Sequence, residues 1–133
     1  MAKLLLRPLY GSEYQGGWDD VLPPAQALRW QSFLTIALKT GELRVPRAVL
    51  KEDSQELSVV AFWDGSLDAH ASCVYLRAQG KDEWDQYEVM VSLVYAKCRV
   101  APLGGSTISK MELQGMVNMT RAVLRFLEAV DVR

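Results

Sequence analysis

Three stretches of apolar residues dominate the middle of the chain and predict a β-sheet. They span residues 56–64, 69–78 and 87–100, and each is rich in β-branched and aromatic side chains. The tight connection GSLD joins the first two, and the polar segment QGKDEWDQ joins the second to the third. Connections of this kind favour an antiparallel meander. Because the strands are apolar over long stretches, we expect both faces of the sheet to be covered.

Two other segments have the spacing of helices. In residues 23–41, two prolines can start a helix and Gly41 can stop it. Residues 110–130 give the clearest helical pattern in the chain. The predicted apolar stripe of the first helix is Trp30, Phe33, Leu34, Ala37 and Leu38, and that of the second is Leu113, Met116, Val117, Val123, Leu124 and Leu127. Residues 1–22 hold glycines and aspartates among scattered aromatics and predict an irregular segment.

These patterns predict an α+β fold in two parts. Pro46 and the polar stretch 51–55 interrupt the pattern, so we place a boundary near Leu50. Residues 1–50 form a helical segment, and residues 51–133 form a three-stranded meander followed by a helix packed on the sheet.

Composition narrows the choice of compartment and partner. A formal net charge of −1 gives no global attraction for polyanions, so any contact with nucleic acid must come from a local patch. Cys73 and Cys98 lack metal-ligand spacing, which favours two buried free thiols. The sequence shows neither a signal-peptide core nor a membrane span, so we expect an intracellular protein, cytoplasmic or nuclear, that has no membrane partner.

Asp64 ends the first predicted strand and is followed at once by Gly65 and Ser66. Alternation places Val60, Phe62 and Asp64 on one strand face, where a charge needs compensation. The alternative is an Asx-turn, which Asp followed by Gly commonly forms.

Glu112, in the second helix, is the other carboxylate of interest. It lies on one strip with Met116, Met119 and Val123, which directs it toward the sheet. The alternative is a capping box in SKME, with Ser109 as the N-cap. If both carboxylates face the seam between helix and sheet, they predict a site for Mg²⁺ or Mn²⁺, since hard divalent cations prefer such oxygens.

The stretches VVAFWDGSLDAHASCVYLR and VSLVYAKCRVAPLGGSTISKMELQGMV resemble the ribonuclease H region of BEL/Pao-type long-terminal-repeat retrotransposon polyproteins. The segment GWDDVLPPAQALRWQSFLTIALKTGELRVPRAV is similar to the connection between reverse transcriptase and ribonuclease H in those polyproteins. The resemblance implies a ribonuclease H-like fold, a mixed five-stranded sheet with helices on both faces. It also implies Mg²⁺-dependent hydrolysis of the RNA strand of an RNA–DNA hybrid.

Residue by residue, the resemblance makes Asp64 and Glu112 catalytic metal ligands. Gly65 stands where Ala is common in the family, which we expect to be a mild change. The family continues into a fourth strand that carries a further metal-binding Asp, and the present sequence ends at Arg133 before any such strand. Asp131 lies at the helix exit and is predicted to be a solvated turn residue. With this incomplete set of carboxylates we expect the chain alone to be a poor nuclease or none.

Other residues suggest binding partners. Ser66, Lys97, Arg99 and Lys110 are candidate nucleic-acid contacts, and the alternative for the basic ones is a solubilising role. Tryptophans 18, 30, 63 and 84 could stack bases, and the alternative, more common for such residues, is a place in the core or an interface. The single histidine, His70, suits packing better than catalysis. An exposed sheet edge would favour pairing with another protein chain or self-association.

Two alternatives to the nuclease hypothesis stay open at this point. The chain can be a retroelement-derived binding or assembly module that has lost catalysis. It can also be an unrelated α+β domain in which Asp64 is a turn residue and Glu112 a cap.

Overall fold

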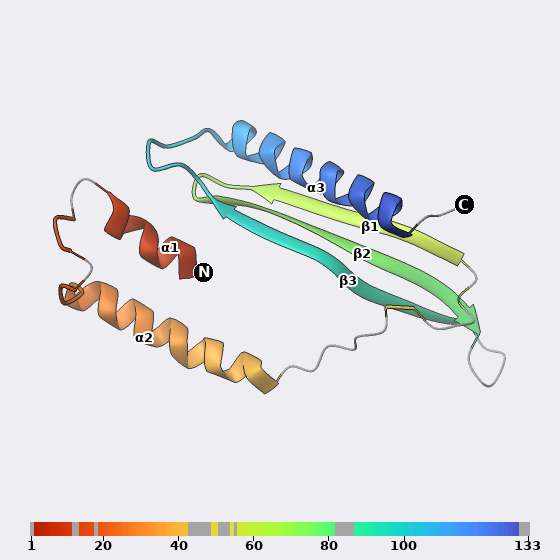
Figure 1. Cartoon of the computed structure of the whole chain (residues 1–133), viewed down its shortest axis with the longest axis horizontal. Helices are drawn as coiled ribbons and strands as arrows, with labels where there is room; N and C mark the ends of the chain where they lie inside the picture. The colour runs from red at the N-terminus through yellow and green to blue at the C-terminus, as the bar shows by residue number, and fades with distance from the viewer. Residues whose placement is uncertain are drawn as a thin grey trace. The chain divides into compact units, whose positions relative to one another are not determined.

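The computed structural model describes residues 2–11, 14–17, 19–42, 49–50, 54, 56–81 and 87–130. The chain divides into two compact units, residues 1–45 with 102–104, and residues 46–101 with 105–133. Each unit is described separately. Figure 1 shows the helices of the first unit and the sheet and long helix of the second.

The first unit consists of helical segments. The α-helix α1 spans Ala2–Leu6 and continues as the 3₁₀ segment η1, Arg7–Tyr10. The predicted helix is confirmed as α2, Pro24–Lys39, followed by η2, Thr40–Glu42. Pro24 stands at the first helical position, where its missing amide costs no hydrogen bond. The prediction that residues 1–22 are irregular is wrong for 2–10, because a five-residue helix that contacts α2 is too short to show a periodic pattern.

The second unit contains the predicted antiparallel meander. Strands β1 (Glu56–Gly65), β2 (Ala69–Lys81) and β3 (Tyr87–Val100) form a sheet in the order β1-β2-β3. β1 pairs with β2 from Glu56↔Gln79 to Gly65↔His70, and a bulge between Val74 and Tyr75 shifts the β2–β3 register. The predicted α+β fold class is confirmed, and the arrangement is consistent with part of a ribonuclease H-like fold.

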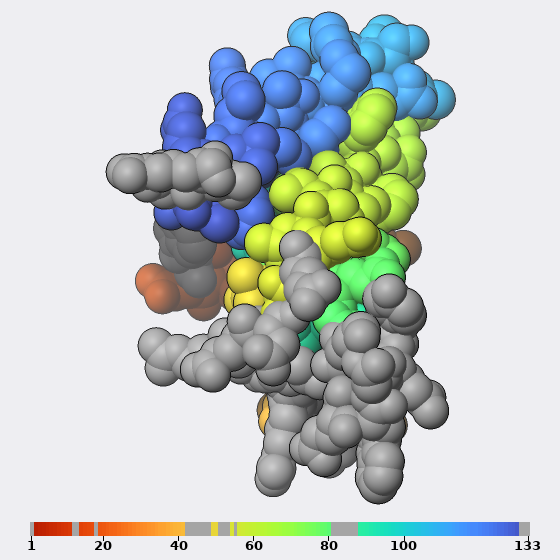
Figure 2. Space-filling model, turned by 90° about the vertical axis from the view of Figure 1, so that its right-hand side faces the viewer, coloured from red at the N-terminus to blue at the C-terminus, as the bar shows by residue number. Residues whose placement is uncertain are grey.

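Helix α3, Ile108–Val130, packs along β1 and β2 on one face of the sheet. Figure 2 shows α3 in blue lying directly beside β1 in yellow-green. The buried residues alternate along β2, and α3 contributes a row of small or flexible ones. They are His70, Ser72, Val74, Leu76 and Ala78 from β2, with Met111, Gly115 and Ala122 from α3. A Cβ built on Gly115 would lie 3.3 Å from the Asp64 carbonyl oxygen, so this glycine lets the helix approach the sheet closely.

The predicted apolar face of α3 is mostly not the face that packs on the sheet. Leu113, Leu124 and Leu127 are 55 %, 55 % and 41 % exposed, and Met116 and Val117 are also classed as exposed. The helix therefore packs on the sheet with Met111, Gly115 and Ala122, and much of its apolar face remains open.

The opposite face of the sheet is also less covered than expected. Val60 and Phe62 of β1 and Val91 and Leu93 of β3 are exposed, with Phe62 and Tyr75 in an edge-on ring contact at 6.2 Å. The prediction that both faces are covered is wrong for these positions. Cys73 and Cys98 are free, as predicted, but Cys98 is exposed and Cys73 half-buried, so they are not buried thiols. None of the described helices combines the length and apolar character needed to cross a bilayer.

Candidate metal centre and nucleic-acid interface

Asp64 lies within β1, where it pairs with Ala71, and the turn after it is organised by Ser66. The Ser66 amide donates to the Ala69 carbonyl over 2.8 Å, and the Ser66 hydroxyl oxygen accepts from the amides of Asp68 and Ala69 over 3.3 and 3.2 Å. The hydroxyl also lies 3.1 Å from the Ala69 carbonyl oxygen, to which it can donate. The Asx-turn alternative for Asp64 is therefore wrong. The Ser66 hydroxyl makes the side-chain hydrogen bonds of this turn, and Asp64 still lies within β1.

The register fixes the face on which Asp64 lies. Gly65 faces α3, since a Cβ on it would meet helix backbone. Because successive strand residues point to opposite faces, Asp64 shares the other face with Phe62 and Tyr75. The expectation that the Asp64 side chain faces the helix–sheet seam is therefore wrong.

The start of α3 decides between the alternatives for Glu112. The helix begins at Ile108, and the Lys110 amide donates to the Thr107 hydroxyl over 3.3 Å, which makes Thr107 the N-cap. The predicted capping box with Ser109 is wrong, and Glu112 lies beyond the first turn. Glu112 is exposed beside the fully buried Met111, so the expectation that it points toward the sheet is also wrong.

The backbones of the two carboxylate residues nevertheless meet at one place. A Cβ built on Gly65 would lie 2.5 Å from the Glu112 amide nitrogen and 2.9 Å from its Cα. Asp64 directly precedes Gly65, so Asp64 and Glu112 emerge from adjoining backbone on opposite sides of β1, a strand that within the described sheet has a partner on one side only. Both side chains are exposed, and no hydrogen bond or ion pair to a described residue engages either carboxylate.

The contact between the end of β1 and the start of α3 requires a glycine at position 65. The expectation that its replacement of Ala is a mild change is wrong for this chain, because an Ala Cβ would overlap the backbone of Met111 and Glu112. The glycine is what allows the end of β1 and the start of α3 to touch.

The donor set suits a single hard cation. Carboxylate oxygens are the ligands that Mg²⁺ prefers, and Mg²⁺ commonly keeps several waters beside one or two carboxylates. No group of three or more His, Cys, Asp or Glu residues able to hold a metal occurs among the described residues. Asp131 lies outside the described residues.

The predicted nucleic-acid contacts separate into three places. The Ser66 hydroxyl is engaged in the hairpin turn. Lys110 precedes Glu112 by two residues, about 200° around the helix, so the two side chains leave it on different sides. Lys97 and Arg99 pair with the buried Ser72 and His70 and therefore lie on the sheet face that carries α3. Arg99 and Gly65 both pair with His70, so Arg99 lies two strands from the end of β1.

Sequence reasoning missed two basic residues that join Lys97 and Arg99. Arg121 and Arg125 of α3 line the same hollow as these two β3 residues. Their spacing of four residues on one helix was the available signal, since side chains at i and i+4 share a face.

His70 is buried, as packing requires. Burial, and secondarily the positive charge of Arg99, hold its pKa below the usual 6.5. This favours the neutral ring.

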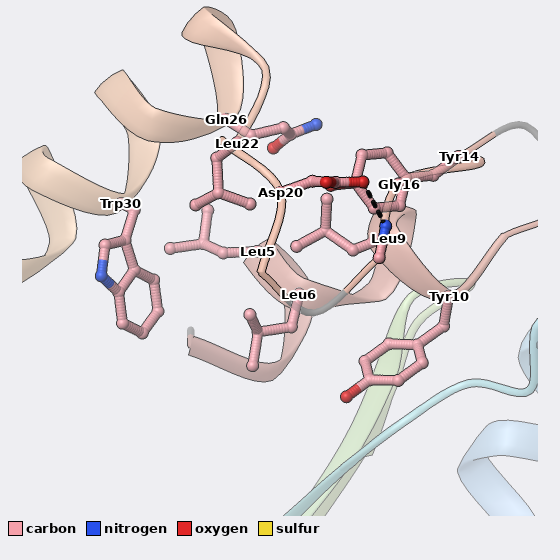
Figure 3. A pocket seen from close by; sticks show the side chains of 11 residues that line it. Leu5, Leu6, Leu9, Tyr10, Tyr14, Gly16, Asp20, Leu22, Gln26 and Trp30 are labelled. Carbon is pink, nitrogen blue, oxygen red and sulfur yellow. Dashed lines mark hydrogen bonds between the residues drawn. The ribbon is translucent and has the colours of Figure 1, made fainter.

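A second hollow, of about 380 Å³, lies within the first unit and is mainly apolar (Figure 3). Leu5, Leu22 and Trp30 line it, and Asp20 accepts a hydrogen bond of 2.6 Å from the Gly17 amide at its rim.

Trp63 lies on β1 and is 45 % exposed, whereas Trp18 and Trp84 fall outside the described residues. Of the four tryptophans considered for base stacking, two are therefore described, one in each unit.

Comparison with known proteins gives one family and no individual relative. No curated protein and no solved structure matches the chain. A family described as the Pao retrotransposon-like RNaseH-like domain matches residues 1–133, which is the whole sequence and includes both the β1 end and the start of α3. The chain belongs to the family of Pao retrotransposon-like RNaseH-like domains.

Proposed function

We propose that this chain provides part of the metal site of a ribonuclease H-type nuclease, with Asp64 and Glu112 as its ligands. In the intact protein, the reaction is hydrolysis of the RNA strand of an RNA–DNA hybrid. The observation that carries the proposal is the contact between Gly65 and the Glu112 backbone, which brings two exposed carboxylates to one end of β1. Membership of the RNaseH-like family supports the class of reaction.

The chemistry assigned to each residue follows from its position. Asp64 reaches the site from the Phe62 face of β1, and Glu112, with its longer side chain, reaches it from the α3 side. A Mg²⁺ or Mn²⁺ ion held there would offset charge that develops on the phosphodiester during in-line attack. The chain's own contribution would be two carboxylates that leave adjoining backbone at the end of β1, where a phosphate oxygen can share the ion.

The experiment measures hybrid affinity with and without Mn²⁺. Fluorescence anisotropy with a labelled RNA–DNA hybrid would compare the natural sequence with an Asp64→Asn/Glu112→Gln double variant. A matched control, Asp19→Asn/Glu128→Gln, removes the same charge from two other exposed positions. We expect Mn²⁺ to raise affinity in the natural sequence and the control, and not in the site variant. An equal Mn²⁺ response in all three proteins would refute the proposal.

A second candidate function is a binding or assembly module without catalysis. The apolar residues exposed on the sheet face opposite α3, among them Phe62, Val91 and Leu93, favour it. Self-association, or pairing with another chain along the β1 edge, would cover surface of this kind. Light scattering on a concentration series tests it, because a module that self-associates forms dimers at micromolar concentration and Phe62→Ser would weaken them.

A further inference from the structure

A hollow of about 440 Å³ lies between β3 and α3, on the α3 side of the sheet and within the second unit. Among the described residues, its lining contains four basic side chains and no acidic one. The cations are Lys97 and Arg99 from β3 and Arg121 and Arg125 from α3.

The fold itself gathers these residues. Helix α3 packs over β1 and β2, and Lys97 and Arg99 near the end of β3 stay exposed on the same side of the sheet. Lys97 and Arg99 are two residues apart on β3 and so lie on one face, about 6.6 Å apart along the strand. Arg121 and Arg125 are four residues apart on α3, about 6 Å along its axis. One row of positive charge thus forms each wall of the hollow.

The charge of this hollow contrasts with the charge of the chain. Four cations line one hollow in a protein of formal net charge −1. All four side chains are exposed, and no ion pair with a described carboxylate neutralises any of them. Four like charges around one hollow repel each other, and an anion placed among them relieves that repulsion. The lowered pKa of His70, to which Arg99 contributes, is consistent with positive potential on this side of the sheet.

The other lining residues suit a nucleotide strand better than a small anion. Tyr95 and Phe126 bring aromatic rings to the hollow, and Asn118 brings an amide that can donate and accept hydrogen bonds. A positively charged groove interleaved with aromatic rings is the arrangement that binds strands through phosphates and stacked bases. The spacing within each basic row is also of the order of that between neighbouring phosphates of one strand.

We propose that the groove between β3 and α3 binds the phosphate backbone of a nucleic-acid strand, at a place separate from Asp64 and Glu112. Arg121 and Arg125 lie about 14 and 20 Å along the helix axis from Glu112, so one strand can engage the groove while another part of the nucleic acid meets the carboxylates. The inference rests on the proposed function for the class of its partner, and on the groove's own charge for its location.

The test measures binding of a labelled RNA–DNA hybrid in EDTA at 50 to 200 mM KCl. Arg121→Gln/Arg125→Gln removes the helix wall, and Lys97→Gln/Arg99→Gln removes the strand wall. Arg29→Gln/Lys39→Gln removes the same charge from exposed positions on α2 and is the matched control. Circular dichroism and melting would verify that each variant folds.

We expect each groove variant to bind about tenfold more weakly than the control at 0.1 M salt. The slope of log affinity against log salt should become shallower by about 1 to 2, as expected when one or two phosphate contacts are lost. Groove variants that bind within twofold of the control, with an unchanged slope, would overturn the inference.

Failure of this inference and failure of the proposed function give different results. Asp64→Asn/Glu112→Gln should lose any Mn²⁺ response. If the groove variants bind normally and the Mn²⁺ response persists, only the groove is rejected. If the groove variants lose affinity and Mn²⁺ has no effect on the natural sequence, only the metal site is rejected.

Discussion

Replacing Gly65 by Ala tests the junction between β1 and α3 on which the metal site depends. The new Cβ would lie 2.5 Å from the Glu112 amide nitrogen, 2.7 Å from the Met111 carbonyl carbon and 2.9 Å from the Glu112 Cα. Ordinary contacts to a Cβ begin near 3.4 Å. The clashing atoms belong to helix backbone, so they cannot move aside by a rotamer change, and the helix start must shift by about 1 Å.

The cost of this shift can be estimated from overpacking. Inserting a methyl group into a well-packed place costs about 1 to 3 kcal/mol and occasionally more, and a backbone obstacle puts Gly65→Ala near 3 kcal/mol. For a chain of 133 residues this corresponds to a fall in Tm of about 10 °C. Gly104→Ala is the control, because a Cβ there meets nothing within 4 Å.

The assay is thermal and urea unfolding followed by far-UV circular dichroism. The reasoning predicts that Gly65→Ala loses stability and that Gly104→Ala stays within about 0.5 kcal/mol of the natural sequence. If Gly65→Ala is as stable as Gly104→Ala, the end of β1 and the start of α3 do not touch as described.

Three further predictions concern local features of the second unit, and each is tested by urea unfolding. Thr107→Ala should cost about 1 kcal/mol of stability by removing the N-cap of α3, whereas Ser109→Ala should be nearly neutral. A larger loss of stability for Ser109→Ala than for Thr107→Ala would contradict this and support Ser109 as the N-cap. Ser72→Ala should raise stability by about 1 kcal/mol, because its buried hydroxyl has no hydrogen-bond partner among the described residues; a loss would reveal a partner. Because the pKa of His70 is lowered on folding, the unfolded chain takes up a proton first as pH falls through about 6.5, so stability should drop there. His70→Gln should lose less stability than the natural sequence between pH 7.5 and 5.5, and an equal loss would contradict this.

The strands and their order could be predicted from the sequence because each is a long apolar run bounded by polar turns. Their bounds agree with the structure to within three residues. Alternation also placed Asp64 correctly on the face of Val60 and Phe62. It could not say which face α3 would cover, since that depends on the path of the chain between β3 and the helix.

The face of α3 was predicted poorly for a different reason. Hydrophobic periodicity gives weight to large apolar residues such as Leu113 and Leu124, and these are exposed. The face that packs on the sheet is chosen by Gly115 and Ala122, whose small size permits close backbone approach and whose hydrophobicity is slight. The N-cap is Thr107 and not Ser109, so Lys110 and not Glu112 stands at the third helical position that a capping box uses.

The groove between β3 and α3 could not be predicted from the sequence, because its two walls come from separate elements of the fold. Lys97 and Arg99 come from a strand, and Arg121 and Arg125 come from a helix more than twenty residues later. Periodicity within one element shows that each pair shares a face, but only the packing of α3 over β1 and β2 shows that the two pairs line one hollow.

The most direct test of the central claim is anomalous diffraction from crystals of the chain grown with Mn²⁺. We expect one strong peak at the end of β1, within about 2.0 to 2.5 Å of a carboxylate oxygen from Asp64 and of another from Glu112. A peak that touches only one of these residues, or the absence of a peak beside both, would contradict the claim that they hold one metal ion together.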